Sequence, residues 1–325
     1  MNPRERTVPA VDVVIVNWNT GHCLRDCLRS IVHTDRSRLT VERIVVVDNA
    51  STDDSLKALS TDGIPLDVLR NPRNRGFAAA CNQGATRGRG ELLLFLNPDT
   101  TLYHDTLRAV AAFLGTPTAR SVGICGGRML DGRGRPGISC SRFPTLRVFF
   151  GKTTGLDRLA PALFPPHHLR PAESGPVDQV IGAFFLLRRT LFERLGGFDE
   201  RYFLYFEETD LALRARHRGL RSYYLHEARV THLAGVSSAQ LGGGRLRHSL
   251  CSRTRYVVRH WPRSHAWLLM ALTLTVEPAA RLARAALHRS ASEARTVLAG
   301  YGGYLRWLAV ETGSARSPSG RRRSA

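Results

Sequence analysis

Carboxylates that follow apolar runs are the residues best placed for chemistry in this sequence. Residues 92–96 form an unbroken apolar run, LLLFL, which ends in Asn97-Pro98-Asp99. A short apolar run closed by a turn predicts a strand that is buried on both faces, and ligands of open α/β sheets lie beyond the carboxyl ends of such strands. We therefore expect Asp99 to hold a divalent metal, which in turn holds a diphosphate. The alternative is a simple turn in which Asp99 caps the following helix.

A second group of carboxylates lies in residues 202–211, YFLYFEETDL, where aromatic residues directly precede Glu207, Glu208 and Asp210. Like charges packed together with little water raise the pKa of at least one of them, which is how a carboxylate becomes a general base near neutral pH. If residues 204–216 are helical, Glu207 and Asp210 share a face, while Glu208 points about 100° away. The alternative is a helix that is stabilised by acidic residues in its first turn.

His232, in the sequence Val-Thr-His at 230–232, is a candidate nitrogen ligand. A single histidine is more often a packed or surface residue than a ligand. A site with one carboxylate and a diphosphate nevertheless leaves room for a neutral ligand, and imidazole suits Mn²⁺. Both interpretations stay open at this point.

Alternating strands and helices must position these residues. Strands that are joined by helices through short connections form a parallel sheet with helices on both faces. The carboxyl ends of parallel strands share an edge, so Asn17, Asp48 and the turn at 97–99 should lie together. The predicted strands are residues 11–16, 43–47, 66–69 and 92–96, and the predicted helices are residues 22–33, 77–86 and 104–114.

The sequence excludes two common nucleotide-binding motifs. A dinucleotide-binding Rossmann domain needs G-x-G-x-x-G directly after its first strand, but residues 17–22 are NWNTGH. The segment RGRG at 87–90 precedes a strand rather than a helix, and the sequence has no Walker A motif.

The middle of the chain gives weaker signals. Residues 121–125 predict a strand, whereas residues 126–176 are rich in Gly, Pro and Arg and predict a partly ordered excursion. Residues 177–187 again predict a strand, which Gly182 interrupts at a point where the backbone would approach a ligand.

Length and composition set the broad class. With 325 residues, of which 43% are hydrophobic, the chain can form one large α/β domain with a helical appendix. The six cysteines contain no Cys-x-x-Cys pair, and the N-terminus shows no apolar signal segment. These features predict a cytoplasmic protein without a zinc ribbon.

Positive charge is concentrated in the last third. The formal net charge is +20, and residues 211–325 carry 20 arginines, no lysine and four acidic residues. Such a skew indicates an anionic partner: a membrane surface, a nucleic acid or a phosphorylated substrate. The alternative is an arginine-rich surface that is simply solvated. No helix-turn-helix, zinc-finger or RNA-binding motif supports a specific nucleic-acid partner.

The same third predicts basic amphipathic helices. Residues 245–263 interleave Arg with Tyr, Val and Trp, and residues 266–276 form an apolar run that Glu277-Pro278 ends at about half the length a bilayer requires. Such helices lie in the interface of an anionic membrane, here the inner face of the plasma membrane. The alternative is a helical pair that packs on the main domain.

Six segments of the sequence form an ordered set. They are VDVVIVNWNT, IVVVDNASTDDS, NRGFAAACNQG, LLLFLNPDT, GGFDERYFLYFEETDLALR and VTHLAGVSS. In this order they resemble the family 2 glycosyltransferases, which have the Rossmann-like GT-A fold. Within the family, the bacterial rhamnosyltransferase-like subgroup that builds cell-envelope polysaccharides is the most similar.

The resemblance implies a GT-A catalytic domain at 1–240, with a nucleotide-sugar half at about 10–125 and an acceptor half at about 126–240. A basic helical extension at 241–312 and a disordered basic tail at 313–325 would follow.

The resemblance implies a nucleotide site built from asparagines and one aspartate. Asp48 would contact the nucleotide base. The residues that would line the rest of the nucleotide site are Asn17, Asn74, Asn82 and Asn97.

The resemblance also implies a metal site and a catalytic base. Asp99 would bind Mg²⁺ or Mn²⁺, with His232 as a further metal ligand or diphosphate contact. The base maps to Glu208, where the family usually has Asp, and Glu207 and Asp210 are the alternatives.

The implied function is inverting, metal-dependent transfer of a rhamnose-like sugar from a nucleoside-diphosphate sugar to a hydroxyl of a cell-envelope glycan or polyprenyl-linked acceptor. A base opposite the leaving group allows a single displacement, which inverts the anomeric configuration. Two other classes stay open. One is a nucleotidyltransferase, whose usual glycine-rich N-terminal loop is missing, and the other is a catalytically inactive partner that binds nucleotide sugars.

Overall fold

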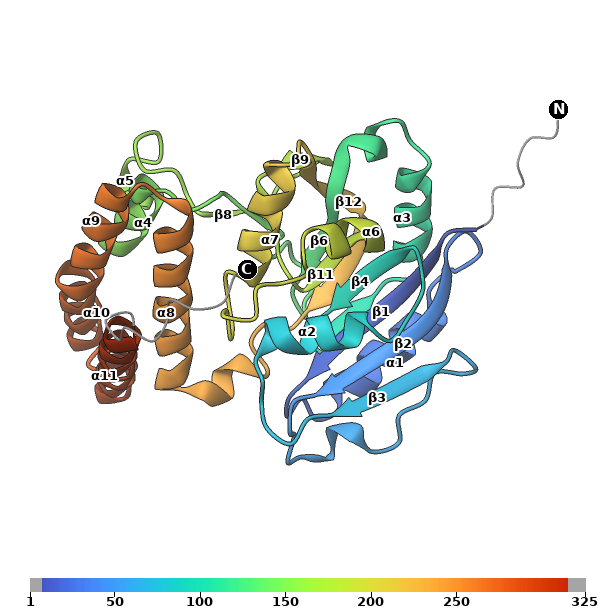
Figure 1. Ribbon diagram of the computed structural model, residues 1–325, viewed down its shortest axis with the longest axis horizontal. Helices are drawn as coiled ribbons and strands as arrows, with labels where there is room; N and C mark the ends of the chain where they lie inside the picture. The colour runs from blue at the N-terminus through green and yellow to red at the C-terminus, as the bar shows by residue number, and fades with distance from the viewer. Residues whose placement is uncertain (1–7, 315–325) are drawn as a thin grey trace, which may run out of the picture. The chain divides into compact units, whose positions relative to one another are not determined.

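One large sheet organises the part of the chain that the computed structural model describes, residues 8–314 (Figure 1). Its strands are β1 (Ala10–Asn17), β2 (Thr40–Asp48), β3 (Leu66–Arg70), β4 (Leu92–Leu96), β5 (Thr100–Leu102), β6 (Val122–Leu130), β9 (Gly175–Val177), β11 (Phe184–Arg188) and β12 (Arg221–His232). They lie in the order β3-β2-β1-β4-β11-β6-β12-β5, with β9 on β12. A smaller sheet contains β7 (Cys140–Ser141), β8 (His168–Leu169) and β10 (Gln179–Val180).

Six of the nine strands of the large sheet run in the same direction. β1 pairs in parallel with β2 and β4, β2 with β3, and β12 with β6. β11 is antiparallel to both of its neighbours, and β5 is antiparallel to β12. The prediction of a mostly parallel α/β sheet is confirmed. As a result β1, β2, β4 and β12 all end at one edge of the sheet, where β11 begins, and we call it the carboxyl edge.

Helices cover both faces of this sheet. α1 (Cys23–His33) and α3 (Thr106–Leu114) share a core with Leu92, Leu94 and Leu96. α2 (Phe77–Ala85), α6 (Arg189–Arg194) and α7 (Glu207–Arg216) share the opposite core with Leu93 and Phe95. Successive side chains of a strand point to opposite faces, so a strand between two helical layers is apolar at every position.

The chain departs from its predicted elements between residues 121 and 216. The strand predicted at 177–187 is divided among β9, β10 and β11, and Gly182 lies in the gap before β11. The region 126–176 contains the end of β6, β7, β8, α4 (Leu146–Thr154) and α5 (Leu156–Leu159). The helix expected from residue 204 begins at Glu207, because Tyr205 and Phe206 have positive φ angles that no right-handed helix contains.

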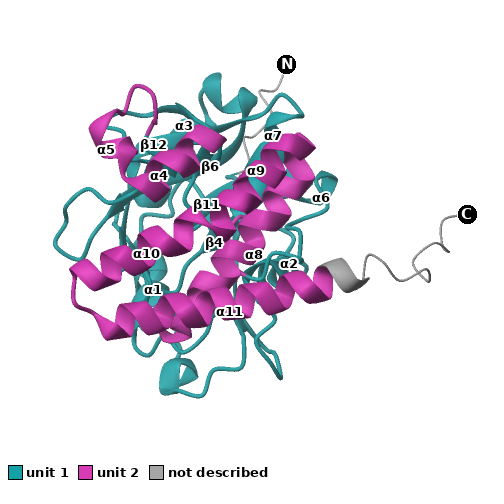
Figure 2. Cartoon of the chain, turned by 90° about the vertical axis from the view of Figure 1, so that its left-hand side faces the viewer, with its two compact units in different colours: residues 1–145, 166–203, 207–237 teal, residues 146–165, 204–206, 238–325 magenta. Residues whose placement is uncertain are grey.

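The described chain from Ser238 onward is mostly helical and belongs to a second compact unit (Figure 2). Its helices are α8 (Gly243–His260), α9 (Arg263–Leu274), α10 (Val276–Leu287) and α11 (Ala291–Ser314). Residues 146–165 and 204–206 belong to the same unit, whereas the first unit comprises the described residues up to 145, 166–203 and 207–237. Residues 315–325, which make up most of the predicted tail, lie outside the described part of the chain.

Glu277-Pro278 ends the apolar run, as expected, but it does not end the helical path. The helical path resumes as α10 from Val276, and Pro278 falls in its first turn, where a missing N–H is tolerated. By length and composition alone, the 25 residues of Arg263–Leu287 suffice to cross a membrane, rather than half of the required length.

A buried ion pair holds the opposite edge of the sheet together. Asp12 in β1 is 1% exposed and pairs with Arg189 of α6. Arg189 also donates to the carbonyls of Ala85 and Gly90, both at 2.7 Å. A Cβ on Gly88 would lie 2.0 Å from an Asp12 carboxylate oxygen. The glycines of the 87–90 segment therefore let the backbone approach this carboxylate.

Arg189→Met should lower the free energy of unfolding by about 3–5 kcal/mol, because it leaves the Asp12 charge buried without its partner. Urea unfolding measures the loss. Arg188 is exposed, so Arg188→Met is the matched control and should change the free energy by less than about 0.5 kcal/mol. Equal losses in the two variants would contradict the assignment.

Candidate functional site

Polar side chains from β1 and β2 meet at the carboxyl edge, as the sequence predicts. Asn17 is fully buried, and its amide nitrogen donates to Asp48 Oδ1 at 2.9 Å and to Ser55 at 2.8 Å. Its amide oxygen accepts from the Thr20 hydroxyl at 2.5 Å. Asp48 also accepts from the hydroxyl and the N–H of Ser51, at 2.5 and 3.1 Å. Asn17 is thus engaged within the protein and orients Asp48 and the loop that follows it.

A carboxylate and an imidazole meet beyond the end of β4. Asp99 Oδ1 lies 3.3 Å from Nε2 of His232, the last residue of β12. The amide nitrogen of Asn97 lies 3.4 Å from the same ring nitrogen, although the two residues are 135 positions apart. The pairing of β5 with β12 brings them together, since His232 is opposite Thr100 and the N–H of Leu233 donates to the Asp99 carbonyl at 3.1 Å.

These donors suit a divalent cation such as Mg²⁺ or Mn²⁺. A carboxylate oxygen and an imidazole nitrogen are both ligands that Mn²⁺ accepts. Among residues 8–314, no group of three or more His, Cys, Asp or Glu could hold a metal ion. Two protein ligands would leave the other positions to substrate oxygens and water, which is the usual arrangement for Mg²⁺ beside phosphates.

Glu208, in the first turn of α7, lies beside the segment that leads into β11. A Cβ on Gly182 would be 3.8 Å from the Glu208 side chain, an ordinary van der Waals contact. The carbonyl of Ala183 accepts from the N–H of Asn97 at 3.0 Å. Residues 182–183 therefore connect Glu208 to the turn that carries Asp99, and both carboxylates belong to the carboxyl edge.

Glu207 and Glu208 form a buried acidic pair. Burial, together with the charge of Glu208, raises the pKa of Glu207 well above its ordinary 4.5. Burial also raises the pKa of Glu208. One carboxyl oxygen of each residue is buried without a hydrogen-bond partner. Glu208 is the less buried of the two, so it is the better placed to exchange a proton with a ligand near neutral pH.

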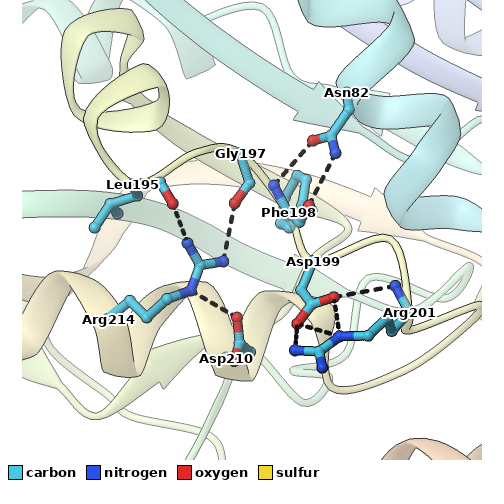
Figure 3. A network of polar contacts seen from close by, with 8 residues as sticks. All are labelled: Asn82, Leu195, Gly197, Phe198, Asp199, Arg201, Asp210 and Arg214. Atoms are coloured by element: carbon cyan, nitrogen blue, oxygen red, sulfur yellow. Dashed lines mark hydrogen bonds and ion pairs between the residues drawn. The ribbon is translucent and has the colours of Figure 1, made fainter. Parts of the chain in front are cut away.

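Asp210 has a different role from this pair (Figure 3). It is fully buried, and its carboxylate accepts from Arg214 Nε at 2.7 Å. Arg214 also donates to the carbonyls of Leu195 and Gly197, at 2.5 and 2.9 Å. Because this arginine engages Asp210, we assign Asp210 to anchoring α7 on the loop at 195–199 rather than to catalysis.

Asn82 holds the same loop from α2 (Figure 3). Its Nδ2 donates to the Phe198 carbonyl at 2.8 Å, and its Oδ1 accepts from the Phe198 N–H at 2.9 Å. A Cβ on Gly197 would lie 2.7 Å from the same Oδ1. The structure thus places this residue, expected at the nucleotide site, against the backbone of the loop.

Asn74 lies in the loop after β3, at the carboxyl edge. Its Oδ1 accepts from the Gly76 N–H at 2.9 Å. Gly76 has a φ of 85°, and a Cβ there would lie 2.5 Å from the Phe203 carbonyl oxygen. The N–H of Phe77 donates to that same oxygen at 2.8 Å. The Asn-Arg-Gly turn therefore lets the chain before α7 approach the start of α2.

The sequence analysis did not predict that Arg214 and Asn82 hold the 195–199 loop by hydrogen bonds to its backbone. Arg214 was one of many arginines, yet its position four residues after Asp210 on a helix is the spacing of an ion pair. No local signal pairs Asn82 with Phe198, which lies 116 positions away.

Comparison with known proteins gives a family match and several relatives. The family model described as Glycosyl transferase family 2 matches residues 12–196. A low-salt glycan biosynthesis hexosyltransferase of Haloferax volcanii is 26% identical over 65% of this chain, and the match spans only 62% of that relative. The N-acetylglucosaminyl-diphospho-decaprenol L-rhamnosyltransferase of Mycobacterium tuberculosis is 29% identical over 68% of this chain and 75% of the relative.

Solved structures share the fold. A mannosyltransferase from Pyrobaculum calidifontis, in complex with GDP-Man and Mn²⁺, is 21% identical with a TM-score of 0.51, covering 95% of this chain and 81% of that one. Residues 1–349 of S. aureus TarS, in complex with UDP-GlcNAc, are 17% identical with a TM-score of 0.53, covering 91% and 81%. At these identities the likeness concerns the fold alone.

The free energy of unfolding should fall as the pH rises through the raised pKa of Glu207. The folded protein keeps this proton at pH values where the unfolded chain, with a pKa near 4.5, has lost it. The folded state then binds more protons, so stability is fully present below pH 4.5 and declines above it. Glu207→Gln cannot ionise and should flatten this decline. Urea unfolding at several pH values measures it, and an unchanged pH dependence in the variant would sink the assignment.

Proposed function

The chain belongs to glycosyl transferase family 2, and from that premise we propose that it transfers a sugar from a nucleoside-diphosphate sugar to an acceptor hydroxyl. The observation that carries the proposal is the arrangement of the carboxyl edge. Asp99 and His232 lie 3.3 Å apart there, and Glu208 lies one short segment away, beside Gly182. Such a transfer needs two kinds of group: side chains that can hold a metal ion, here Asp99 and His232, and a carboxylate that can accept a proton, here Glu208.

Asp99 and His232 would hold Mg²⁺ or Mn²⁺ at the diphosphate end of the donor. The ion, when bound, neutralises the charge that develops on the departing nucleoside diphosphate. Asn97 contributes a neutral contact at this point, since its amide adds no charge. Asp48 would contact the nucleotide base, and Asn17 would act through Asp48, which it holds at 2.9 Å.

Glu208 would act as the general base. It takes the proton of the acceptor hydroxyl while that oxygen bonds to the anomeric carbon, and the bond from this carbon to the diphosphate oxygen breaks. Attack from the face opposite the leaving group inverts the anomeric configuration. Burial raises the pKa of Glu208, which makes this carboxylate a stronger proton acceptor than an exposed one.

The relatives guide the choice of substrates. The mycobacterial relative is named as a rhamnosyltransferase that acts on a diphospho-decaprenol-linked sugar, and another relative, from Escherichia coli, is named as a rhamnosyltransferase. We propose a rhamnose-like donor sugar and a polyprenyl-linked or cell-envelope glycan acceptor, used at the inner face of the plasma membrane. A nucleotidyltransferase or a catalytically inactive partner is disfavoured by the joint presence of Asp99, His232 and Glu208 at one edge.

A panel of nucleotide sugars with and without Mn²⁺ tests the donor site. We expect one donor to raise the melting temperature only with the metal, and Asp99→Asn to abolish that shift because it removes the charged ligand. Glu193→Gln, on the exposed surface of α6, is the control and should keep the full shift. If no nucleotide sugar stabilises the wild-type protein, the proposed function is wrong.

Glu208→Gln should lower the rate of sugar transfer by about 10²–10⁴-fold, because glutamine cannot accept the proton. The variant should still bind the donor, since Glu208 acts on the acceptor. In the wild type the rate should rise with pH as Glu208 loses its proton. Steady-state transfer and donor-induced thermal shifts, measured side by side with Glu193→Gln, separate the two effects. Near-normal turnover in Glu208→Gln would refute its role as the base.

A further inference from the structure

The second unit carries helices whose outward faces are apolar. On α9 the exposed side chains Trp267, Leu268 and Leu274 are 68%, 51% and 39% accessible. They recur at helical spacing, so they form one stripe. On α10 a second exposed stripe follows directly along the chain, formed by Val276, Ala279, Ala283 and Leu287.

The inward faces of the same helices carry buried polar and charged groups beside apolar residues such as Leu269 and Ala285. Thr273 and Glu277 are 3% and 4% exposed. Arg253 of α8 donates to both of them, to Thr273 at 2.8 Å and to Glu277 at 2.5 Å. Arg281 donates to the other carboxylate oxygen of Glu277 at 2.8 Å. Hydrogen bonds and ion pairs thus satisfy the inward side, while hydrocarbon faces outward.

The exposed apolar stripes distinguish these helices from ordinary surface helices. A helix on a water-soluble domain turns its apolar stripe to the core and its charges to solvent. Burial of Trp267, Leu268 and Leu274 in a second apolar medium would recover about 25 cal/mol per Å² of apolar surface. The arrangement therefore calls for an outer partner with an apolar interior.

The charge around the stripes identifies that partner. Exposed arginines lie at the two ends of the helical pair, at Arg263 and Arg289, within α10 at Arg284, which pairs with Glu293, and on α11 at Arg295 and Arg306. Residues 211–325 hold 20 arginines against four acidic residues, so a second copy of the chain would be repelled. An anionic lipid bilayer meets both requirements. Its hydrocarbon interior would take up the apolar stripes, and its negatively charged headgroups would lie at the level of the arginines.

We propose that the outward stripes of α9 and α10 insert into the headgroup region of an anionic membrane and lie in the interface without crossing it. A crossing helix would place Glu277 near the middle of the 25-residue stretch Arg263–Leu287, in the hydrocarbon core, where charged groups are costly, and Arg281 one turn further along. An interfacial helix keeps these charges on its protein side. The inference concerns docking alone and does not depend on the reaction.

Vesicle co-sedimentation of the full chain tests the inference. Vesicles of phosphatidylcholine alone are compared with vesicles containing about a quarter of phosphatidylglycerol, an anionic lipid. We expect the mixed vesicles to bind the protein at least about tenfold more tightly. The double variant Trp267→Asp with Leu274→Asp should lose at least about tenfold of that affinity. Both positions face outward, so circular dichroism and melting temperature should stay unchanged.

The matched control is Val8→Asp, at a residue of the first unit that is 47% exposed, and it should bind like the wild type. Fluorescence gives a second readout, because Trp267→Phe should remove most of the blue shift on vesicles yet keep the binding. Unchanged binding of the double variant, or equal binding to neutral vesicles, would overturn the proposal. Retention of the bound protein through an alkaline carbonate wash would overturn the interfacial placement in favour of a spanning helix.

Discussion

The arrangement of the site depends on one reversal of strand direction. β11 runs antiparallel between β4 and β6, so its first residues reach the edge at which β1, β2, β4 and β12 end. That reversal lets Ala183 bond to Asn97 and places Gly182 beside Glu208. Because β11 is antiparallel to both β4 and β6, β6 and its parallel neighbour β12 run in the direction of β4, and β12 ends at the same edge with His232. Hydrogen bonding across the sheet thus determines where each chemical group can stand.

Buried polar neighbours hold the carboxylates of the site in position through hydrogen bonds. The side-chain amide of Asn17 forms hydrogen bonds with Asp48, Ser55 and Thr20. The guanidinium of Arg214 donates to Asp210 and to two loop carbonyls. Buried polar groups are costly unless they are hydrogen-bonded. One carboxyl oxygen of Glu207 and one of Glu208 are among the buried atoms of the described chain that have no such partner. Carboxylates in this state would suit the proton transfer proposed for Glu208.

The second unit also buries charged groups as an ion pair, but it leaves large apolar side chains exposed. Its buried ion pair between Arg253 and Glu277 faces inward, while Trp267 and Leu274 face outward. A helical fold suits water and lipid surroundings equally well. Which of the two suits the outer surface of α9 and α10 depends on the side chains that point outward. The sequence pattern of basic amphipathic helices points to membranes, and the structure identifies the stripes that would enter one.

The amino-acid sequence is enough to predict the α/β layering, because the period of the apolar residues decides whether a segment becomes a strand or a helix. It also predicts that Asn17, Asp48 and Asn97 share an edge, because parallel strands end together. Only the folded chain brings His232 to Asp99 and Asn82 to Phe198. Those contacts join positions that lie on separate elements or on helix faces, and their partners depend on strand register and on side-chain direction. No local pattern of residues encodes these, which is why three carboxylates that looked alike in sequence differ in the folded protein.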